Sequence, residues 1–294
     1  MDTDALIEWV LERSVGECEG PDAPPKLAAA LRYAVFPGGA RVRPQLCLAV
    51  AHAVGDDDDP AAIQAAAGAG AAIELLHCAS LVHDDLPCFD GADLRRGKPS
   101  VHCAYGEPLA VLAGDALIVA AFRAVVRECE PQKYATLPAL MDILNTAVGA
   151  PSGIVAGQAW ESEEVIDLSA YHRAKTGAMF VAATMAGAAA QGVDPLPWRA
   201  IGDRLGEAYQ VADDVRDTVL SARELGKPKG QDALNARPNA VETHGLQGAL
   251  NRLDALITAA ADAVPDCRGA GMLRGLIAAQ ANRLMPQSLL EKVA

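Results

Sequence analysis

Two aspartate-rich segments, each at the end of an apolar stretch with a helical pattern, constrain this chain more than any other feature. The first runs from His83 to Asp90 and the second from Gln210 to Asp217. Burying an unpaired carboxylate is costly, and two like charges 4 Å apart repel by about 4 kcal/mol at an effective dielectric constant near 20. If both segments face one cleft, their carboxylates must either force each other's protonation or bind divalent cations. Oxygen ligands without paired Cys or His favour Mg²⁺.

The composition favours an all-α fold. Hydrophobic residues make up 51% of the 294 residues, with alanine dominant, whereas aromatic residues make up only 4%. Closely packed helices suit this composition better than a sandwich or a barrel, whose strands favour aromatic and β-branched residues. Helical patterns alternate with short Pro/Gly breaks, and neither a βαβ rhythm nor a repeat of fixed period appears. We therefore expect one helical bundle with a central cavity, in a single domain that covers residues 1–294.

Charge and cysteine usage narrow the class of protein further. The net charge of −13 argues against nucleic acid or anionic membrane as a partner. The seven cysteines are scattered without a CxxC pair, which favours reduced thiols and a cytoplasmic location. An uncharged stretch of 18 residues, 176–193, is mostly Ala and Gly and predicts a buried helix rather than stable membrane insertion. The densest acidic run, residues 56–59, stands between Gly55 and Pro60 and predicts an ordinary helix start.

The spacing within each cluster predicts which carboxylates converge. Asp213 and Asp217 are four residues apart, so on a helix they differ by about 40° and share a face. Asp214 points about 100° away, which favours a supporting electrostatic role. Asp84 and Asp90 are six residues apart and would lie on different faces of a straight helix.

A proline resolves this difficulty in the first cluster. Pro87 cannot donate a hydrogen bond to the carbonyl of His83, and it disfavours helical geometry at the residue before it. We therefore expect the helix to end there, with the loop through Gly91 bringing Asp90 back beside Asp84.

Basic residues near both clusters complete a pattern that suits a polyphosphate. Arginine binds phosphate oxygens through two parallel hydrogen bonds, and lysine acts as a point charge. No GxxxxGK[ST] loop is present, so a nucleoside triphosphate fits poorly. The basic residues near the clusters, near a glycine turn and at the start of a small-residue helix are Arg95, Arg96, Lys98, Lys227, Arg41, Arg43 and Lys175.

These residues, in this order, resemble the trans-polyprenyl diphosphate synthases of the isoprenoid synthase family. The similarity extends from about Tyr33 to Arg237 and includes five separate motifs. Residues 83–100 resemble the first aspartate-rich motif in its longer bacterial and plant form, and residues 209–217 resemble the second. Within the family, the chain is most similar to the geranylgeranyl diphosphate synthases of bacterial carotenoid and bacteriochlorophyll pathways. The resemblance implies the isoprenoid synthase helical bundle and a homodimer.

The resemblance also implies a reaction and its residues. Three Mg²⁺ ions would bind an allylic diphosphate and assist its ionisation, through Asp84, Asp90, Asp213 and Asp217. Asp85 and Asp214 would complete the two catalytic clusters. Further contacts to this diphosphate would come from Arg95, Lys175, Lys227, Thr176 and Gln210. Isopentenyl diphosphate, whose double bond attacks the allylic cation, would bind through its own diphosphate to Arg43, Arg96 and His77, with Arg41 nearby.

Two departures from the family pattern and one ambiguous residue bear on these sites. Ala40 stands where the family usually has a lysine, so one contact to isopentenyl diphosphate is missing. Residues 235–239 replace the usual Gly-Lys-x-Thr segment. His77, two turns before the aspartates, could instead be a core histidine, although its place in the family pattern favours substrate binding.

Small residues before the first cluster predict the product. Ala79 is five residues before Asp84 and Ser80 is four before it, where relatives that stop at fifteen carbons tend to carry an aromatic residue. A small side chain opens the tunnel by about one helical turn, roughly 5.4 Å, which is comparable to one isoprene unit. We therefore expect a C20 product, with the deeper floor formed by Leu75, Leu76 and Phe122. The alternatives are a C15 synthase, a terpene cyclase and a non-catalytic synthase subunit.

Overall fold

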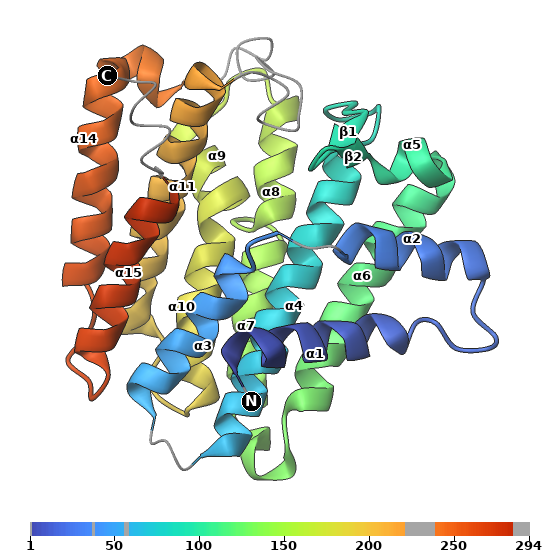
Figure 1. Ribbon diagram of the computed structural model, residues 1–294, viewed down its shortest axis with the longest axis horizontal. Helices are drawn as coiled ribbons and strands as arrows, with labels where there is room; N and C mark the ends of the chain where they lie inside the picture. The colour runs from blue at the N-terminus through green and yellow to red at the C-terminus, as the bar shows by residue number, and fades with distance from the viewer. Residues whose placement is uncertain (1, 37–38, 56–58, 221–238, 285–294) are drawn as a thin grey trace.

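The computed structural model describes residues 2–36, 39–55, 59–220 and 239–284 (Figure 1). The prediction of an all-α fold is confirmed, because the only sheet in this part of the chain is a two-stranded antiparallel hairpin of β1 (Leu94–Arg95) and β2 (Lys98–Pro99). The α-helices are α1 (Thr3–Gly16), α2 (Pro25–Val35), α3 (Val42–Val54), α4 (Pro60–Asp84), α5 (Val101–Tyr105), α6 (Glu107–Glu128), α7 (Leu137–Val148), α8 (Ile154–Ala159), α9 (Leu168–His172), α10 (Ala178–Ala190), α11 (Arg199–Val219), α14 (Ala240–Asp262) and α15 (Ala270–Leu284).

Helix α4 lies in the middle of the bundle and packs against α3, α6 and α10 (Figure 1). It begins as the sequence predicts, with Pro60 in the first turn and the Asp59 carboxylate accepting a hydrogen bond from the backbone N–H of Ala62 at 3.0 Å. Small residues let the neighbouring helices approach closely. A Cβ atom at Gly187 of α10, for example, would lie 2.3 Å from the carbonyl oxygen of Cys47 on α3. This close packing explains why alanine dominates the composition.

Within the described residues, two helices are long and apolar enough to cross a membrane, judged by length and composition only. They are α4 and α6. In α4, 83% of the most apolar 18-residue stretch is buried inside the protein, and in α6 the buried share is 44%. Such helices also form the cores of bundles, as α4 does here. The sequence had singled out residues 176–193 instead. That segment forms the 13-residue α10 after a π-helical turn, too short for a span of about 20 residues.

A buried ion-pair network fixes the start of α3. Arg41 adopts a left-handed backbone conformation (φ 49°) immediately before the helix. Its guanidinium donates to Glu74 of α4 at 2.9 Å, to Glu8 of α1 at 2.8 Å and to the carbonyl oxygen of Val35 at 3.0 Å. Arg41 and Glu74 are both buried, whereas the Glu8 side chain is 46% exposed. The network therefore joins α1, α2, α3 and α4.

We predict that Glu74→Ala destabilises the fold strongly, because it leaves the Arg41 charge buried without its main partner. The expected loss is about 3–5 kcal/mol in the free energy of unfolding, measured by urea denaturation. Glu8→Ala is the matched control, since it removes an exposed partner of the same arginine and should cost about 1 kcal/mol or less. Equal losses for the two variants would contradict this account of the network.

Candidate active site

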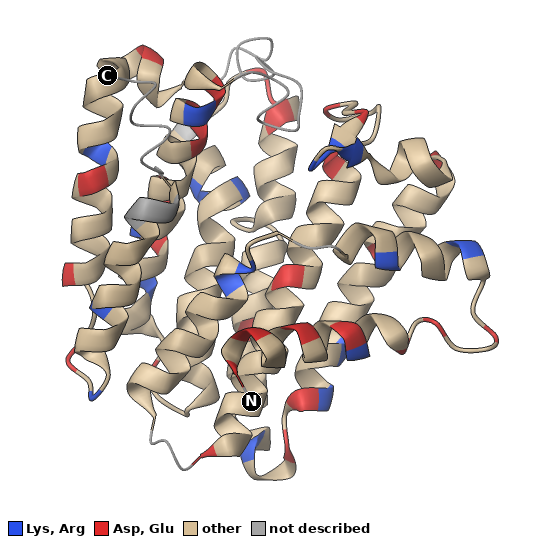
Figure 2. Ribbon diagram, viewed as in Figure 1, with Lys and Arg blue, Asp and Glu red and all other residues tan. Residues whose placement is uncertain are grey.

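One cavity of about 650 Å³ gathers most of the residues singled out in the sequence. This volume lies within the range of about 300–1,000 Å³ that is usual for ligand sites. Side chains from α4, α8, α10 and α11 line it, together with the loop that follows α4. The predicted residues that line it are Arg43, His77, Ala79, Ser80, Asp84, Asp90, Arg95, Lys175, Thr176, Gln210, Asp213 and Asp217. Acidic and basic segments meet near the end of α4 that carries Asp84 (Figure 2).

The first aspartate cluster has the geometry expected from the sequence. Helix α4 ends at Asp84, and the backbone N–H of Asp90 donates to the carbonyl oxygen of Asp84 at 3.0 Å. Gly91, with φ 57°, closes the loop by donating to the carbonyl oxygen of Leu86 at 3.0 Å. A positive φ costs glycine little, so the turn is strain-free. The carboxylates of Asp84 and Asp90 thereby converge.

A third carboxylate, from Glu161, joins this cluster. Oxygen atoms of Asp84, Asp90 and Glu161 all lie within 4.8 Å of one another. Three oxygen ligands at this spacing fit a hard divalent cation such as Mg²⁺. Glu161 could not be predicted from the sequence pattern, because it is 71 residues from Asp90 and lies outside both aspartate-rich segments. The available signal was Gln158, which precedes it by three residues on the same short helical segment and donates to it at 2.9 Å.

Lys175 neutralises part of this charge. It lies in the π-helical turn η3 (Arg173–Gly177), a type of irregularity that often marks functional sites. Its ammonium contacts Asp84 at 3.3 Å and Glu161 at 2.5 Å. Burial raises the pKa of Asp84, and the charge of Lys175 opposes this shift. The lysine thus stabilises the carboxylate form in which Asp84 can bind a cation or face a bound diphosphate.

The second cluster divides as the helix geometry predicts. Asp213 and Asp217 on α11 both line the cavity. Asp214 is buried behind them and accepts hydrogen bonds from Gln210 at 3.0 Å and from the backbone N–H of Ala240 at 2.7 Å. Asp214 therefore lies outside the cavity lining, as expected for a residue with a supporting electrostatic role. Asp214 anchors the start of α14, and it orients the Gln210 amide, whose oxygen accepts from Thr176 at 3.0 Å.

Asp85 does not line the main cavity either. Its buried carboxylate instead receives Arg95, whose Nε donates at 3.0 Å and whose terminal nitrogen also bonds to it. Burial raises the pKa of Asp85, and the hydrogen bonds from Arg95 oppose this shift. Arg95 reaches the cavity from the β1–β2 hairpin, whose turn residues Arg96 and Gly97 both have positive φ. This is the type I′ pattern of a tight hairpin. Asp85 is thus a positioning residue for Arg95.

A second polar region, formed by the Arg43 guanidinium and the His77 imidazole, lines the same cavity. The guanidinium of Arg43 lies 4.7 Å from the centre of the Phe180 ring, and its Nε is buried without a hydrogen-bond partner. Burial lowers the pKa of His77 well below its ordinary value, and the nearby arginines, Arg43 first among them, lower it further. A buried donor without an acceptor is costly, so this region is suited to bind an anion.

Two arginines assigned to the second diphosphate lie elsewhere. Arg41 does not reach the cavity, because its donors are occupied by Glu8, Glu74 and Val35. Arg96 lines a separate cavity of about 170 Å³ beside the hairpin, but its charge, like that of Arg43, lowers the pKa of His77. Its contact with isopentenyl diphosphate stays a prediction.

The proposed tunnel residues also divide into two groups. Ala79, Ser80 and Leu76 line the cavity, whereas Leu75 and Phe122 pack in the surrounding core. The sequence alone does not show which face of α6 carries Phe122, on which its expected place at the bottom of the cavity depends. Ile118, one turn earlier on α6, reaches the cavity instead, together with Val148 and Met179.

Two predictions concern residues outside the described part of the chain. Lys227 lies there, and so do residues 235–238 of the segment that departs from the family pattern. Asn239 is described and caps α14, its side chain accepting a hydrogen bond from the backbone N–H of Val241 at 2.8 Å.

The chain is similar to known proteins over most of its length. The chain matches the polyprenyl synthetase family over residues 24–269. It is 52% identical to a geranylgeranyl diphosphate synthase of Cereibacter sphaeroides, with 98% of each chain covered, and 50% identical to one of Rhodobacter capsulatus, with 97% of each covered. A solved structure of a Helicobacter pylori geranyltransferase, complexed with magnesium and isoprenyl diphosphate, is 29% identical with a TM-score of 0.78 and covers 95% of this chain and 97% of its own. The chain belongs to the polyprenyl synthetase family.

Proposed function

We propose that this protein is a geranylgeranyl diphosphate synthase, which condenses isopentenyl diphosphate with allylic diphosphates. One observation carries the proposal: Asp84 and Asp90 of the three-carboxylate cluster line the same cavity as Arg43, whose buried Nε has no hydrogen-bond partner. One anionic substrate can therefore bind through metal ions at the carboxylates, and a second can bind directly to the Arg43 guanidinium. The names of the relatives that are 50–52% identical support the same assignment.

The first region would bind the allylic diphosphate. Asp84, Asp90 and Glu161 would hold Mg²⁺ on one side, and Asp213 and Asp217 on the other, with three ions in all. Bound Mg²⁺ neutralises the diphosphate and makes it a better leaving group. Lys175 and Arg95 add fixed positive charge where negative charge develops, and the Thr176–Gln210–Asp214 chain holds the polar wall in place.

The second region would bind isopentenyl diphosphate. Arg43 supplies the unsatisfied donor, and His77, neutral in the free protein, can donate through one ring nitrogen. The double bond of this substrate attacks the allylic cation, forming a carbon–carbon bond. A proton then leaves the new cation for the released diphosphate. A terpene cyclase has no need of this second anion site.

The apolar part of the cavity would hold the growing chain. Ala79 and Ser80 stand on α4 just below the carboxylates, and Leu76 follows one turn deeper. No aromatic side chain occupies positions 79 or 80, so the chain can extend past the length of a C15 product. This supports C20 as the main product.

We further propose that the protein is a cytoplasmic homodimer whose residues 1–294 act as one polyprenyl synthase domain. Helix α6 supports the dimer, since Leu112, Val119 and Val126 recur every seven residues on it and are 50–68% exposed. Such a stripe suits a helix–helix contact between two copies. All seven cysteines are free, which agrees with a reducing compartment.

The proposed function is tested by incubating the purified protein with Mg²⁺, isopentenyl diphosphate and, separately, dimethylallyl, geranyl or farnesyl diphosphate. We expect a C20 diphosphate, and no product when isopentenyl diphosphate is omitted. A hydrocarbon formed from one allylic diphosphate alone would indicate a cyclase. Absence of elongation from every allylic substrate would indicate a non-catalytic subunit.

Asp84→Asn should lower kcat/KM by at least about 100-fold, because it removes a charged metal ligand where the leaving group develops charge. Asp142→Asn is the matched control: it removes the same charge from an exposed position on α7 outside the cavity, and should leave the rate unchanged. Chelation of Mg²⁺ with EDTA should abolish turnover, and added Mg²⁺ should restore it. Turnover of Asp84→Asn at the wild-type rate would argue against this metal site.

Ser80→Phe should shift the main product from C20 to C15, because the ring would fill the cavity one turn below Asp84. Ala79→Tyr should act in the same direction from the neighbouring position. Ser80→Ala, which keeps the cavity open, serves as control and should still make C20. Chromatography of the dephosphorylated products measures the shift, and unchanged C20 output from both large variants would disprove the tunnel assignment.

A further inference from the structure

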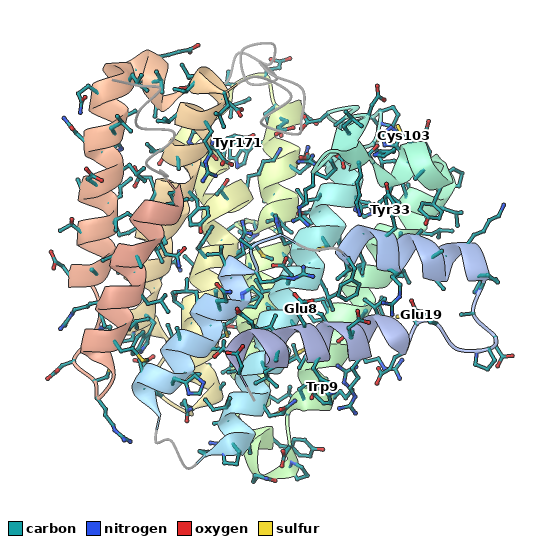
Figure 3. The ribbon with its side chains drawn as sticks, in the orientation of Figure 1. Glu8, Trp9, Glu19, Tyr33, Cys103 and Tyr171 are labelled. Carbon is teal, nitrogen blue, oxygen red and sulfur yellow. The ribbon has the colours of Figure 1, made fainter. Side chains whose placement is uncertain are left out.

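A second group of potential metal ligands lies outside the cavity, at the base of the β1–β2 hairpin. Asp93 immediately precedes β1, and His102 and Cys103 lie on α5 just after β2. The ligand atoms of these three residues lie within 4.8 Å of one another. Figure 3 shows Cys103 beside the hairpin, away from the cavity residue Tyr171. The reaction proposed above uses none of the three.

Their spacing fits a tetrahedral ion. The Cys103 thiol donates to Asp93 Oδ1 at 3.5 Å, and its sulfur lies 3.4 Å from His102 Nε2. Zinc bonds of about 2.3 Å to sulfur and about 2.1 Å to nitrogen or oxygen, at a tetrahedral angle, place neighbouring ligand atoms about 3.6 Å apart. Both distances thus match the edges of such a tetrahedron to within about 0.2 Å.

The histidine ring is also held as metal-ligating rings usually are. The hydroxyl of Ser100, a buried residue, lies 3.0 Å from His102 Nδ1. A hydrogen bond at one ring nitrogen fixes the orientation of the ring and leaves the other, Nε2, to face Asp93 and Cys103. This arrangement is an observation independent of the ligand spacing, and it too indicates a metal site.

We propose that Asp93, His102 and Cys103 bind a Zn²⁺ ion, with a water molecule as the fourth ligand. Thiolate and imidazole ligands favour zinc, whereas Mg²⁺ prefers oxygen ligands alone. The cluster of Asp84, Asp90 and Glu161 offers only oxygen ligands and therefore favours Mg²⁺ over zinc. On binding, the Cys103 thiol loses its proton to solvent, and no oxidant or reductant takes part.

The ion would join the two ends of the hairpin. Its ligands come from the residue before β1 and from the first turn of α5 after β2, so the closed loop contains Arg95 and Arg96. A metal bridge at this place restrains the hairpin that carries Arg95 toward Asp85. Zinc therefore strengthens the positioning of a cavity arginine from outside the cavity.

Zinc binding is tested by titrating Zn²⁺ into metal-stripped full-length protein by calorimetry. Excess Mg²⁺ is present to occupy oxygen-only sites, together with a reductant that contains no thiol. We expect one tight ion per chain, and at least ~10-fold weaker binding in Cys103→Ser and His102→Ala. Cys88→Ser, which removes another exposed thiol, is the control and should bind as the wild type does. Thermal melts in EDTA verify that each variant is folded.

Two results would overturn the proposal: no zinc binding by the wild type under these conditions, or equal binding by the wild type and Cys103→Ser. The bridging role has its own readout, which does not depend on catalysis. Zn²⁺ should slow tryptic cleavage after Arg95 and Arg96 in the wild type but not in Cys103→Ser. Equal cleavage rates would refute the restraint of the hairpin.

Discussion

Electrostatic repulsion among the carboxylates at the end of helix α4 is the constraint on which the cavity depends. Oxygen atoms of Asp84, Asp90 and Glu161 lie within 4.8 Å of one another, so these carboxylates repel one another unless cations lie nearby, and burial raises the pKa of Asp84. Lys175 meets part of this demand by contacting both Asp84 and Glu161. Metal ions and a diphosphate would meet the rest. Substrate binding is therefore favoured by the same electrostatic requirement that makes the free site costly.

Neighbouring aspartates take different roles because helix geometry turns them to different sides. Asp84 faces the cavity, whereas Asp85 turns toward the hairpin and holds Arg95. On α11, Asp213 faces the cavity and Asp214 holds Gln210 and the start of α14. Each cluster thus pairs a residue directed at the substrates with one that fixes its surroundings, which preorganises charge in the cavity.

Site geometry that depends on residues close together in the sequence can be predicted from the sequence. Geometry that depends on packing between distant segments is predicted less well. The convergence of Asp84 and Asp90 follows from a proline and a glycine within eight residues. Glu161 could not be placed from its spacing, because only the fold brings it to Asp84. The hydrogen bond from Arg41 to Glu74, which lies 33 residues away, depends on packing in the same way and could not be predicted from spacing. Phe122 was misassigned because the face of α6 that meets the cavity depends on how that helix packs.

The central claim is that metal ions and diphosphate bind to the carboxylate cluster together. Titration of inorganic diphosphate into the protein by calorimetry, with and without Mg²⁺, tests it most directly. The account predicts that Mg²⁺ tightens diphosphate binding by at least about 100-fold, or 2.7 kcal/mol, and that Asp84→Asn loses most of this gain. Equal affinity with and without Mg²⁺, or a gain that Asp84→Asn retains in full, would contradict it.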